Sequence, residues 1–574
     1  MSITRITTRT RHRKILAYDF EWVPGVLKIR LCGIYDGNTY RSYPDVRTFL
    51  TRELVAANRG AWFFAHAGGL ADVSFVLEQA MLMNRWDVEA SFSGSSAIIV
   101  HLREKHTRNV FHFVDSFWLL RTSLHKIGKW IGIEKLAASE RETEEGARAY
   151  YANAPFSELR TYNQRDCVIL WTAVTMMEDI LHGMGSQLQM TIASCAMQLF
   201  RRVYLQSDIA TCDVVNDIAK FSYVASRVEV FCSDCDEANY YDINSSFPFC
   251  MTQPCPGELT GAGDRIPDHG LYIADVEVTV PEIMIPPLPY RHKNRIYFPS
   301  GSWRNWFTSV DLEYLQECGG TINHTYEVLL FEERTDLRDY AIDVYEKRKG
   351  APPESFESAV YKVMLNSLYG KFAEQRVKTG FLYDPVRFPS NMIGPPEMVF
   401  PGGFLIRTEA EVPHAHVPIS AFITARSRAN LGRFMQACDE VYYCDTDGFA
   451  TSSTLPTSTE LGDLKLEKVI SHGRFVSPKI YRLDKASGEV IVKAKGFSLG
   501  RDEKAAIAKW ERVASDCEVQ IERMLRIREL YRTGSTRPTE EPYSKRLRRT
   551  LMDKRFMYPD GSSRPWTVEE IIEE

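Results

Sequence analysis

The sequence predicts a multidomain protein of mixed α/β and α+β class, and two observations support this prediction. The chain has 574 residues, too many for one hydrophobic core, so about three or four domains are expected. Strand-like runs between residues 15 and 66 are followed by helical stretches, whereas residues 441–451 read as two strands joined by a turn. Carboxylates recur on these strands, which indicates chemistry that depends on metal ions.

The composition is that of an ordinary globular protein, with 44% hydrophobic and 25% charged residues. No apolar run approaches the length of a membrane span, so no membrane partner is expected. Twelve scattered cysteines and the lack of a signal peptide favour a reducing, cytoplasmic location. The net charge of −5 gives no bulk attraction to nucleic acid, so such a role would require local basic surface.

Two features have alternative interpretations. Cys232 and Cys235 form a CxxC pair, with Cys250 and Cys255 close behind, but the four flank a predicted core strand, so a zinc site is not favoured. Residues 1–14 are basic and contain no acid, which is compatible with a transit peptide. Because a core strand begins at Ile15, a flexible basic arm is the favoured interpretation.

A strand is predicted over residues 15–23, where Asp19 and Glu21 interrupt an apolar run. Successive side chains on a strand alternate between its faces, so these two carboxylates project from the same face. Residues 31–35 are predicted to be its antiparallel neighbour, and residues 61–66 another buried strand. The sequence therefore predicts a sheet with paired acids on one face.

Two helices are expected to bring further acids to this sheet. Asp72 stands at the start of an apolar helix, and Tyr162 and Asp166 share a face of a helical stretch over residues 158–172. Any one of these acids is commonly just a surface residue. The ordered set of four carboxylates suits a phosphodiesterase with two metal ions, one activating water and the other stabilising the leaving oxygen.

The stretch from Tyr442 to Phe449 contains Asp445 and Asp447 between strand-like runs. Asp447-Gly448 is a typical hairpin dipeptide because a primed turn needs positive φ, so the turn is predicted there. Two carboxylates at a hairpin tip without a nearby base suit hard divalent cations. Taken alone, such a sequence is more often only a turn.

Another strand is predicted to end at Asp242, followed by a polar turn through Ser245 to Phe247 and Pro248. This position would let Asp242 share metal ions with the acids of the hairpin. The backbone N–H groups of the turn suit a triphosphate, and the ring of Phe247 suits packing against a sugar. A strand followed by a proline-ended turn is the ordinary alternative.

Residues 361–372 are predicted to be helical, with Lys362, Asn366 and Tyr369 on one face. A cation, an amide and an aromatic ring on one helix face suit a nucleotide, because the cation meets phosphate and the ring meets base or sugar. A solvated helix face is the alternative.

The order Asp19-x-Glu21, Asp72 and Tyr162-x-x-x-Asp166 resembles the three exonuclease motifs of proofreading DNA polymerases. The resemblance implies an RNase H-like 3′-5′ exonuclease domain. In that domain the four acids bind metal ions and Tyr162 contributes to catalysis.

The segment that begins with Ser123 and Leu124 is similar to the single-strand-binding motif of the protein-primed subgroup of these polymerases, which implies that both residues contact DNA. In the second exonuclease motif the family usually has an Asn and an aromatic residue that touch the primer end. This sequence has Ala67 and Ala71 at those positions. A weakened hold on the frayed primer is therefore expected.

The remaining motifs resemble motifs A, B and C of family B DNA polymerases, in the family's order. The resemblance spans roughly residues 17–496 and implies a right-hand polymerase with palm, fingers and thumb. It implies that Asp242, Asp445 and Asp447 are catalytic and hold two Mg²⁺ ions, with Mn²⁺ as an alternative. The implied nucleotide-binding residues are Ser245, Phe247, Lys362, Asn366, Tyr369 and Lys371.

Residues 477–481 are similar to the family's Lys-x-Tyr element, which implies that Lys479 and Tyr481 position the primer of a template–primer DNA. Phe247 stands where the family usually has a Tyr; its ring still excludes a 2′-hydroxyl, so dNTPs remain the expected substrates. Residues 223–226 replace the family's Tyr-x-Gly-Gly linker, so the balance between synthesis and degradation is not fixed by the motif.

Residues 282–350 form a long segment, and its part from Thr325 to Lys349 is similar to the first insertion of the protein-primed subgroup, which occurs in bacteriophages, adenoviruses and linear plasmids. Residues 373–417, which are rich in Pro and Gly, are similar to the second insertion of that subgroup. This similarity implies a terminal priming protein as a partner and a monomeric, strand-displacing enzyme. Ordinary loop variation is the alternative. A primer-independent family B polymerase and a catalytically silent DNA-binding replication factor are the rival functions.

The resemblance also divides the chain into regions. These are a basic arm (1–14), the exonuclease domain (15–185), a linker and palm with motif A (186–280), a first insertion-like region (281–350), fingers with motif B (351–372), a second insertion-like hairpin (373–417), palm with motif C and Lys-x-Tyr (418–496) and a thumb or C-terminal region (497–574).

The C-terminal region contains a dense run of basic residues. Such a run is usually a solvated face, but in a thumb it would neutralise phosphates of the duplex. The residues expected to contact DNA are Lys545, Arg546, Arg548 and Arg549.

Overall fold

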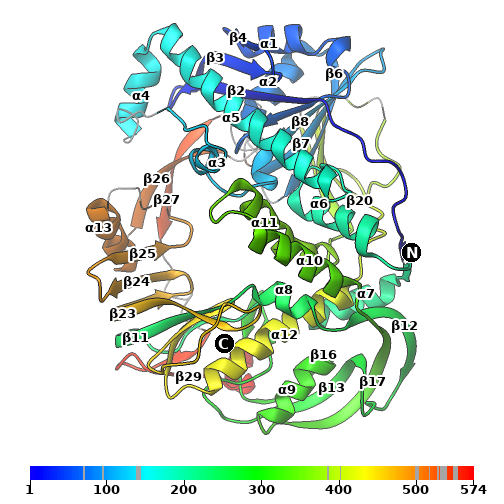
Figure 1. The fold of residues 1–574 in the computed structure, drawn as a ribbon, viewed down its shortest axis with the longest axis vertical. Coiled ribbons are helices and arrows are strands. Elements are labelled where there is room, and N and C mark those ends of the chain that lie inside the picture. Colours follow the sequence, from blue (N-terminus) through cyan, green and yellow to red (C-terminus); the bar gives the residue numbers. More distant parts are fainter. Residues whose placement is uncertain are drawn as a thin grey trace.

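The computed structural model describes most of the chain (Figure 1). The described residues are 1–68, 72–93, 96–136, 144–383, 385, 387–400, 403–497, 499, 503–515, 518–525, 529, 539–546 and 554–573. Among them, no helix combines the length and the apolar character that crossing a membrane requires. The architecture is a mixed α/β and α+β one, as predicted.

A ten-stranded sheet dominates the N-terminal region, in the order β19-β20-β18-β6-β7-β8-β5-β2-β3-β4. The predicted strand over residues 15–23 is confirmed as β2, which pairs antiparallel with β3 and parallel with β5. The strands are β2 (Ile15–Val23), β3 (Lys28–Tyr35), β4 (Tyr40–Tyr43), β5 (Trp62–Ala65), β6 (Trp86–Ser93), β7 (Ser96–Glu104), β8 (Val110–Asp115), β18 (Val377–Tyr383), β19 (Met398–Phe400) and β20 (Gly403–Glu409).

Helices cover both faces of this sheet because the side chains of β2 alternate. Leu16, Tyr18 and Phe20 pack with α1 (Val46–Glu53) and α2 (Asp72–Met83). Ile15 and Ala17 belong instead to a core shared with α5 (Phe156–Gly183). The acids of β2 follow the second set in parity, so they face α5.

The segment over residues 373–417 contains a β-hairpin that joins the N-terminal sheet. Its strand β18 pairs antiparallel with both β20 and β6. Phe381 is fully buried in the core beneath. Two segments that are far apart in the sequence therefore complete one sheet.

A second, entirely antiparallel sheet has the order β10-β21-β22-β11-β23-β24-β25. It contains Asp242 and Asp445, Asp447 lies in the turn between β21 and β22, and α8 (Ser246–Met251) and α12 (Val417–Gln436) lie nearby (Figure 1). Its strands are β10 (Val228–Val230), β11 (Asp234–Ile243), β21 (Val441–Asp445), β22 (Gly448–Thr451), β23 (Leu464–Ser477), β24 (Ile480–Lys485) and β25 (Val490–Ala494).

A four-stranded sheet and a helix pair separate β11 from β21 in the sequence. The sheet, β12-β17-β13-β16, takes strands from both sides of the boundary predicted at residue 281, so that boundary does not divide the structure. Helices α10 (Asp336–Gly350) and α11 (Phe356–Lys371) pack together and lie between the two large sheets (Figure 1). The strands are β12 (Cys255–Gly263), β13 (Leu271–Val280), β16 (Gly301–Thr308) and β17 (Thr321–Arg334).

The N-terminal arm is held against the protein, contrary to the expectation of a flexible arm. Strand β1 (Ser2–Ile3) pairs with β9 (Ile209–Ala210), and Ile3 is fully buried. Farther along, the backbone N–H of Arg11 donates to the side chain of Gln187 at 3.1 Å. Local composition could not show these contacts because the partners come from a much later part of the sequence.

The C-terminal region divides into two parts, whereas one unit was predicted. The first contains α13 (Glu503–Ala514) and the hairpin of β26 (Glu518–Met524) and β27 (Glu540–Arg546). The second, residues 554–573, returns to the sheet that contains Asp445. There Arg555 is 1% exposed and lies near the fully buried Glu229 of β10, with 3.7 Å between Nη1 and Oε2.

Candidate active sites

The first carboxylate cluster consists of Asp19, Glu21, Asp72 and Asp166. Asp19 and Glu21 come from one face of β2, Asp72 from the first turn of α2, and Asp166 from α5. The backbone N–H of Phe20 donates to Oδ1 of Asp72 at 3.0 Å and so ties α2 to β2. The structure therefore brings together the four acids that the sequence grouped.

Burial and mutual repulsion destabilise the ionised forms of these carboxylates. Burial raises the pKa of Asp19 well above its ordinary value, and the neighbouring Glu21, Asp72 and Asp166 raise it further. The pKa of Glu21 is also raised, and that of Asp72 is raised to about 7, in each case mainly by burial. Oxygen ligands with unbalanced negative charge are what hard divalent cations bind, so the donor set fits such ions.

Asn163 organises this cluster, although it was not among the predicted site residues. Its Nδ2 donates to Oδ2 of Asp19 at 2.9 Å and to Oε1 of Glu21 at 3.3 Å, while its Oδ1 accepts from the hydroxyl of Tyr40 at 2.9 Å. It lies next to Tyr162 on α5 and three residues before Asp166. That spacing could have placed it on the Asp166 side of the helix.

Lys135 is the second residue, after Asn163, that contacts this cluster and was not predicted from the sequence. Its Nζ lies 2.7 Å from Oδ2 of Asp166 and 5.0 Å from the centre of the Tyr162 ring. Burial lowers the pKa of Lys135, but Asp166 and Tyr162 outweigh burial and the pKa is raised overall. The lysine therefore stays charged and neutralises part of the cluster.

A cavity of about 500 Å³ opens beside this cluster. Ser123 and Leu124 line it together with Asp19 and Asp166, as the predicted DNA-contacting role requires. Ser123 also caps the helix α3 (Leu124–Trp130), because its hydroxyl accepts from the N–H of Lys126 at 3.3 Å. Ala67 lines the same cavity, whereas Ala71 lies outside the described residues.

The second carboxylate cluster consists of Asp242, Asp445 and Asp447. Asp242 of β11 lies opposite Gly448 of β22, and the N–H of Ile243 donates to the carbonyl of Asp447 at 2.8 Å. Asp445 ends β21 and pairs with Gly448 as well. The three acids therefore meet at one end of the second sheet, as predicted.

The turn that separates Asp445 from β22 differs from the predicted one. Its central residues are Thr446 and Asp447, and Thr446 has a φ of +68°. Gly448 is the first residue of β22 and does not have a positive φ. The N–H of Thr446 donates to the carbonyl of Arg227 at 2.9 Å, which holds the turn in place. The glycine instead allows the close approach of Tyr240, because an added Cβ would lie 3.0 Å from that ring.

This second cluster also favours cations. Burial and then Asp447 raise the pKa of Asp242 to about 7, while burial and then Asp445 raise the pKa of Asp447 to about 6. Nζ of Lys479 lies 2.8 Å from Oδ1 of Asp445. The N–H of Lys479 donates to the hydroxyl of Tyr443 at 2.9 Å, so the lysine is fixed beside the acids. Tyr481 and Lys479 line a pocket of about 570 Å³ together with the three acids of the cluster.

An aromatic pair lies between α8 and α11. Phe247 stacks on Tyr369 with ring centres 4.4 Å apart and an angle of 16° between the rings. Lys362 and Asn366 are exposed on α11, on the side of the helix predicted to share a face with Tyr369. A flat apolar ring pair near an exposed cation and amide fits the predicted nucleotide-binding surface.

Lys371 does not belong to this surface. It lies nine residues, or two and a half helical turns, after Lys362, which puts it on the opposite side of α11. Its Nζ pairs with Glu374 at 2.8 Å. Arg348 of α10 was missed instead: its Nη1 donates to the hydroxyl of Ser245 at 3.1 Å, beside the turn that follows Asp242.

The predicted basic contacts of the C-terminal region are only partly described. Nζ of Lys545 donates to the carbonyl of Gly496 at 2.6 Å and lies 4.8 Å from the centre of the Phe497 ring. Arg546 ends β27. Arg548 and Arg549 lie outside the described residues.

Residues 134–383 match the family model for DNA polymerase type B, organellar and viral. A probable DNA polymerase of the fungus Ascobolus immersus is 23% identical over 504 residues, which cover 75% of this chain and 41% of that protein. The DNA-directed DNA polymerase of Enterobacteria phage PRD1 is 24% identical over 512 residues, covering 85% of this chain and 86% of the phage protein. The chain thus spans less than half the length of its fungal relatives but most of the phage protein.

The fold resembles that of Phi29 DNA polymerase complexed with primer-template DNA. The TM-score is 0.72 at 19% identity, and the match covers 94% of this chain and all of the other. The complex that also contains incoming nucleotide substrates gives a TM-score of 0.71 at 18% identity. These likenesses establish a shared fold.

Proposed function

We propose that this chain is a type B DNA-directed DNA polymerase with a 3′-5′ exonuclease domain, because residues 134–383 match the model for the organellar and viral type B enzymes and the chain is similar to the PRD1 enzyme along most of its length. The observation that supports this most is the meeting of Asp242, Asp445 and Asp447 at one end of the second sheet.

The second carboxylate cluster is the proposed site of synthesis. Asp242 and Asp447 would hold two divalent cations, Mg²⁺ in our proposal, with Asp445 assisting. Bound there, such ions lower the pKa of a primer 3′-hydroxyl and offset charge on the phosphate that is attacked. Lys479, which contacts Asp445 at 2.8 Å, would exchange this carboxylate for the primer backbone when DNA binds.

The surface between α8 and α11 is the proposed dNTP site. Phe247 and Tyr369 already stack on one another, so the floor for base or sugar is preorganised. Lys362 and Arg348 would meet the triphosphate, Arg348 from its position beside Ser245. The exposed amide of Asn366 would contact the same nucleotide. Lys371 has no such role in this proposal, since its charge is matched by Glu374.

The first carboxylate cluster is the proposed exonuclease site. Its acids would hold divalent cations, Asn163 would fix the orientation of two of them, and Lys135 would limit their repulsion. Leu124 and Ser123 line the adjacent cavity and would contact the 3′ end of a single strand. Ala67 offers only a methyl group there, so the hold on that strand would be weak.

We also propose that replication is primed by a terminal protein and that the enzyme displaces strands as a monomer. Support comes from the similarity to the PRD1 enzyme along most of both chains and from the hairpin of residues 373–417. Extension of a primer on a singly primed circular template with dNTPs and Mg²⁺ tests the proposal. Products longer than one circle are expected. Products that stop at one circle would contradict the proposed strand displacement. No incorporation would favour a catalytically silent replication factor.

A further inference from the structure

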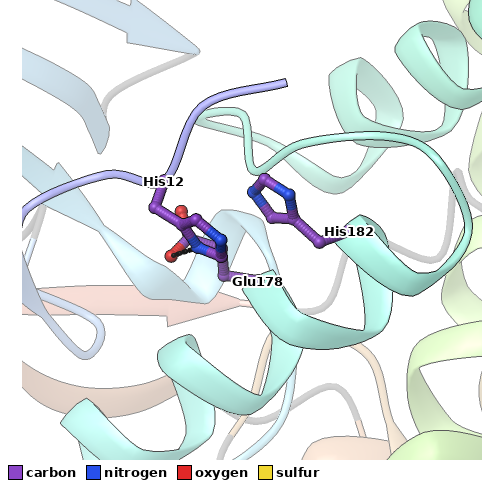
Figure 2. A group of neighbouring side chains, drawn as sticks. All are labelled: His12, Glu178 and His182. Carbon is purple, nitrogen blue, oxygen red and sulfur yellow. Dashed lines mark hydrogen bonds and ion pairs between the residues drawn. The ribbon is translucent and has the colours of Figure 1, made fainter. Parts of the chain in front are cut away.

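A group of three metal-ligand side chains lies outside both carboxylate clusters. His12 belongs to the N-terminal arm, and Glu178 and His182 lie four residues apart on one face of α5 (Figure 2). Their ligand atoms all lie within 4.8 Å of one another, and they form the single such group among the described residues. Glu178 is twelve residues from Asp166, about 18 Å along the helix, so the group is separate from the first carboxylate cluster.

The surroundings of the group favour a cation. The Glu178 side chain is 5% exposed, and its Oε1 accepts from the backbone N–H of Arg13 at 2.7 Å. Its Oε2 faces Nδ1 of His12 at 3.3 Å. Nε2 of His182 is buried and has no hydrogen-bond partner among the described residues. The bond from Arg13 fixes the orientation of the Glu178 carboxylate. Its Oε2 and the buried Nε2 of His182 are therefore available as metal ligands.

The ligand types select the ion. Two imidazoles and one carboxylate suit Zn²⁺ or a similar borderline cation, with a fourth position left for water. The acids of the two clusters offer only oxygen and suit Mg²⁺ instead. The group therefore differs chemically from the sites proposed for synthesis and degradation.

The present arrangement is close to, but not yet, a coordination geometry. The His12 and His182 rings are stacked, with centres 3.9 Å apart and 10° between their planes. Because the lone pair of a ring nitrogen lies in the plane of its ring, the lone pairs of two parallel rings do not converge on one point. Ligand atoms of a tetrahedral zinc are roughly 3.4 Å apart and their lone pairs do converge. The His12 side chain is 67% exposed, so its ring is free to turn toward a shared ion.

We propose that His12, Glu178 and His182 bind a zinc-type divalent cation that fastens the N-terminal arm to α5. Residues 4–11, between β1 and this group, have no regular structure and are held by isolated hydrogen bonds, such as those from the N–H of Ile6 to the carbonyl of Arg201 at 3.0 Å and from the N–H of Arg11 to the side chain of Gln187 at 3.1 Å. Arg5, Arg9 and Arg11 in this segment are exposed. The pairing of β1 with β9 already fixes the N-terminal end of this segment. A bound metal ion would fix its C-terminal end at His12.

Zinc binding tests the site directly. Purified metal-free protein is titrated with Zn²⁺ in an excess of Mg²⁺ that fills the carboxylate clusters, and Co²⁺ serves as a spectroscopic probe. One equivalent of Zn²⁺ is expected for the natural protein, with a visible Co²⁺ spectrum typical of nitrogen ligands. Both are lost in His12→Ala and in His182→Ala, and both are kept in His12→Cys, since thiolate is also a zinc ligand.

Proteolysis tests the fastening of the arm. Cleavage by trypsin after Arg9 and Arg11 is expected to slow about tenfold when free Zn²⁺ is tenfold above its dissociation constant, because the bound form is protected. His269→Ala, at an exposed histidine elsewhere, is the matched control and keeps the protection. His12→Ala, a change at an exposed side chain that leaves the fold intact, abolishes it. Equal zinc binding and equal protection in all variants would assign the ion to the carboxylate clusters and overturn the proposal.

Discussion

Gly33 of β3 lies against Asn163, and replacing it with alanine is expected to disable the exonuclease site alone. An added Cβ would lie 1.6 Å from Oδ1 of Asn163 and 2.8 Å from the hydroxyl of Tyr40. Real Cβ atoms essentially never approach closer than 3.0 Å, so the amide of Asn163 must move away from β3. Its bonds to Asp19 and Glu21, now 2.9 Å and 3.3 Å, would then break.

The effect on rate follows from that displacement. A misplacement of about 1 Å near a reacting centre costs about 100-fold, and overpacking a core costs about 1–3 kcal/mol of stability. Gly33→Ala should therefore slow degradation of a labelled single-stranded oligonucleotide about 100-fold, while primer extension stays within about twofold because the second carboxylate cluster is distant. Gly183→Ala is the control: Gly183 lies in α5, the helix that carries Asn163, and an added Cβ there would meet nothing within 4 Å. Degradation by Gly33→Ala within threefold of the natural rate would refute the assigned role of Asn163.

Two further predictions concern synthesis. Arg348→Ala should raise the KM for dNTP about tenfold or more because a charged contact to phosphate is lost, whereas Lys371→Ala should leave the KM nearly unchanged. Steady-state primer extension measures both values. Equal effects of the two substitutions would contradict the proposed dNTP site. The Mg²⁺ concentration for half-maximal synthesis should fall as pH rises from about 6 to about 8, because metal binding needs Asp242 and Asp447 deprotonated and their pKa values are raised to about 7 and about 6. A half-saturating Mg²⁺ concentration that does not change with pH would contradict the binding of Mg²⁺ by Asp242 and Asp447.

The strands and the acids were predictable because their patterns are local. The alternation around Asp19 and Glu21 gives β2 its bounds and its acidic face, and the apolar runs around Asp242 and Asp447 give β11, β21 and β22. The grouping of these acids into two separate sites could be predicted only from the order of the motifs along the chain. A strand alternates over two residues, so few residues suffice to define it.

What the sequence did not show depends on contacts between distant segments. Asn163, Lys135 and Arg348 act through partners on other elements of the fold, and of the three only Asn163 had a local signal, its spacing of three residues from Asp166. The error at Lys371 had a local warning, since nine residues are two and a half turns. The turn at Thr446 was misplaced because a glycine that permits close packing was taken for one that supplies a positive φ.

The central claim is that Asp242, Asp445 and Asp447 form the site of synthesis, separate from the site of degradation. It is tested by incorporation of labelled dNTP and by primer shortening without dNTPs, measured on the natural protein and on Asp447→Asn. The account predicts that the variant loses synthesis at least about 10³-fold, because a metal ligand at the reacting phosphate contributes several kcal/mol, and that it shortens primers at the natural rate. Synthesis by Asp447→Asn near the natural rate would contradict it.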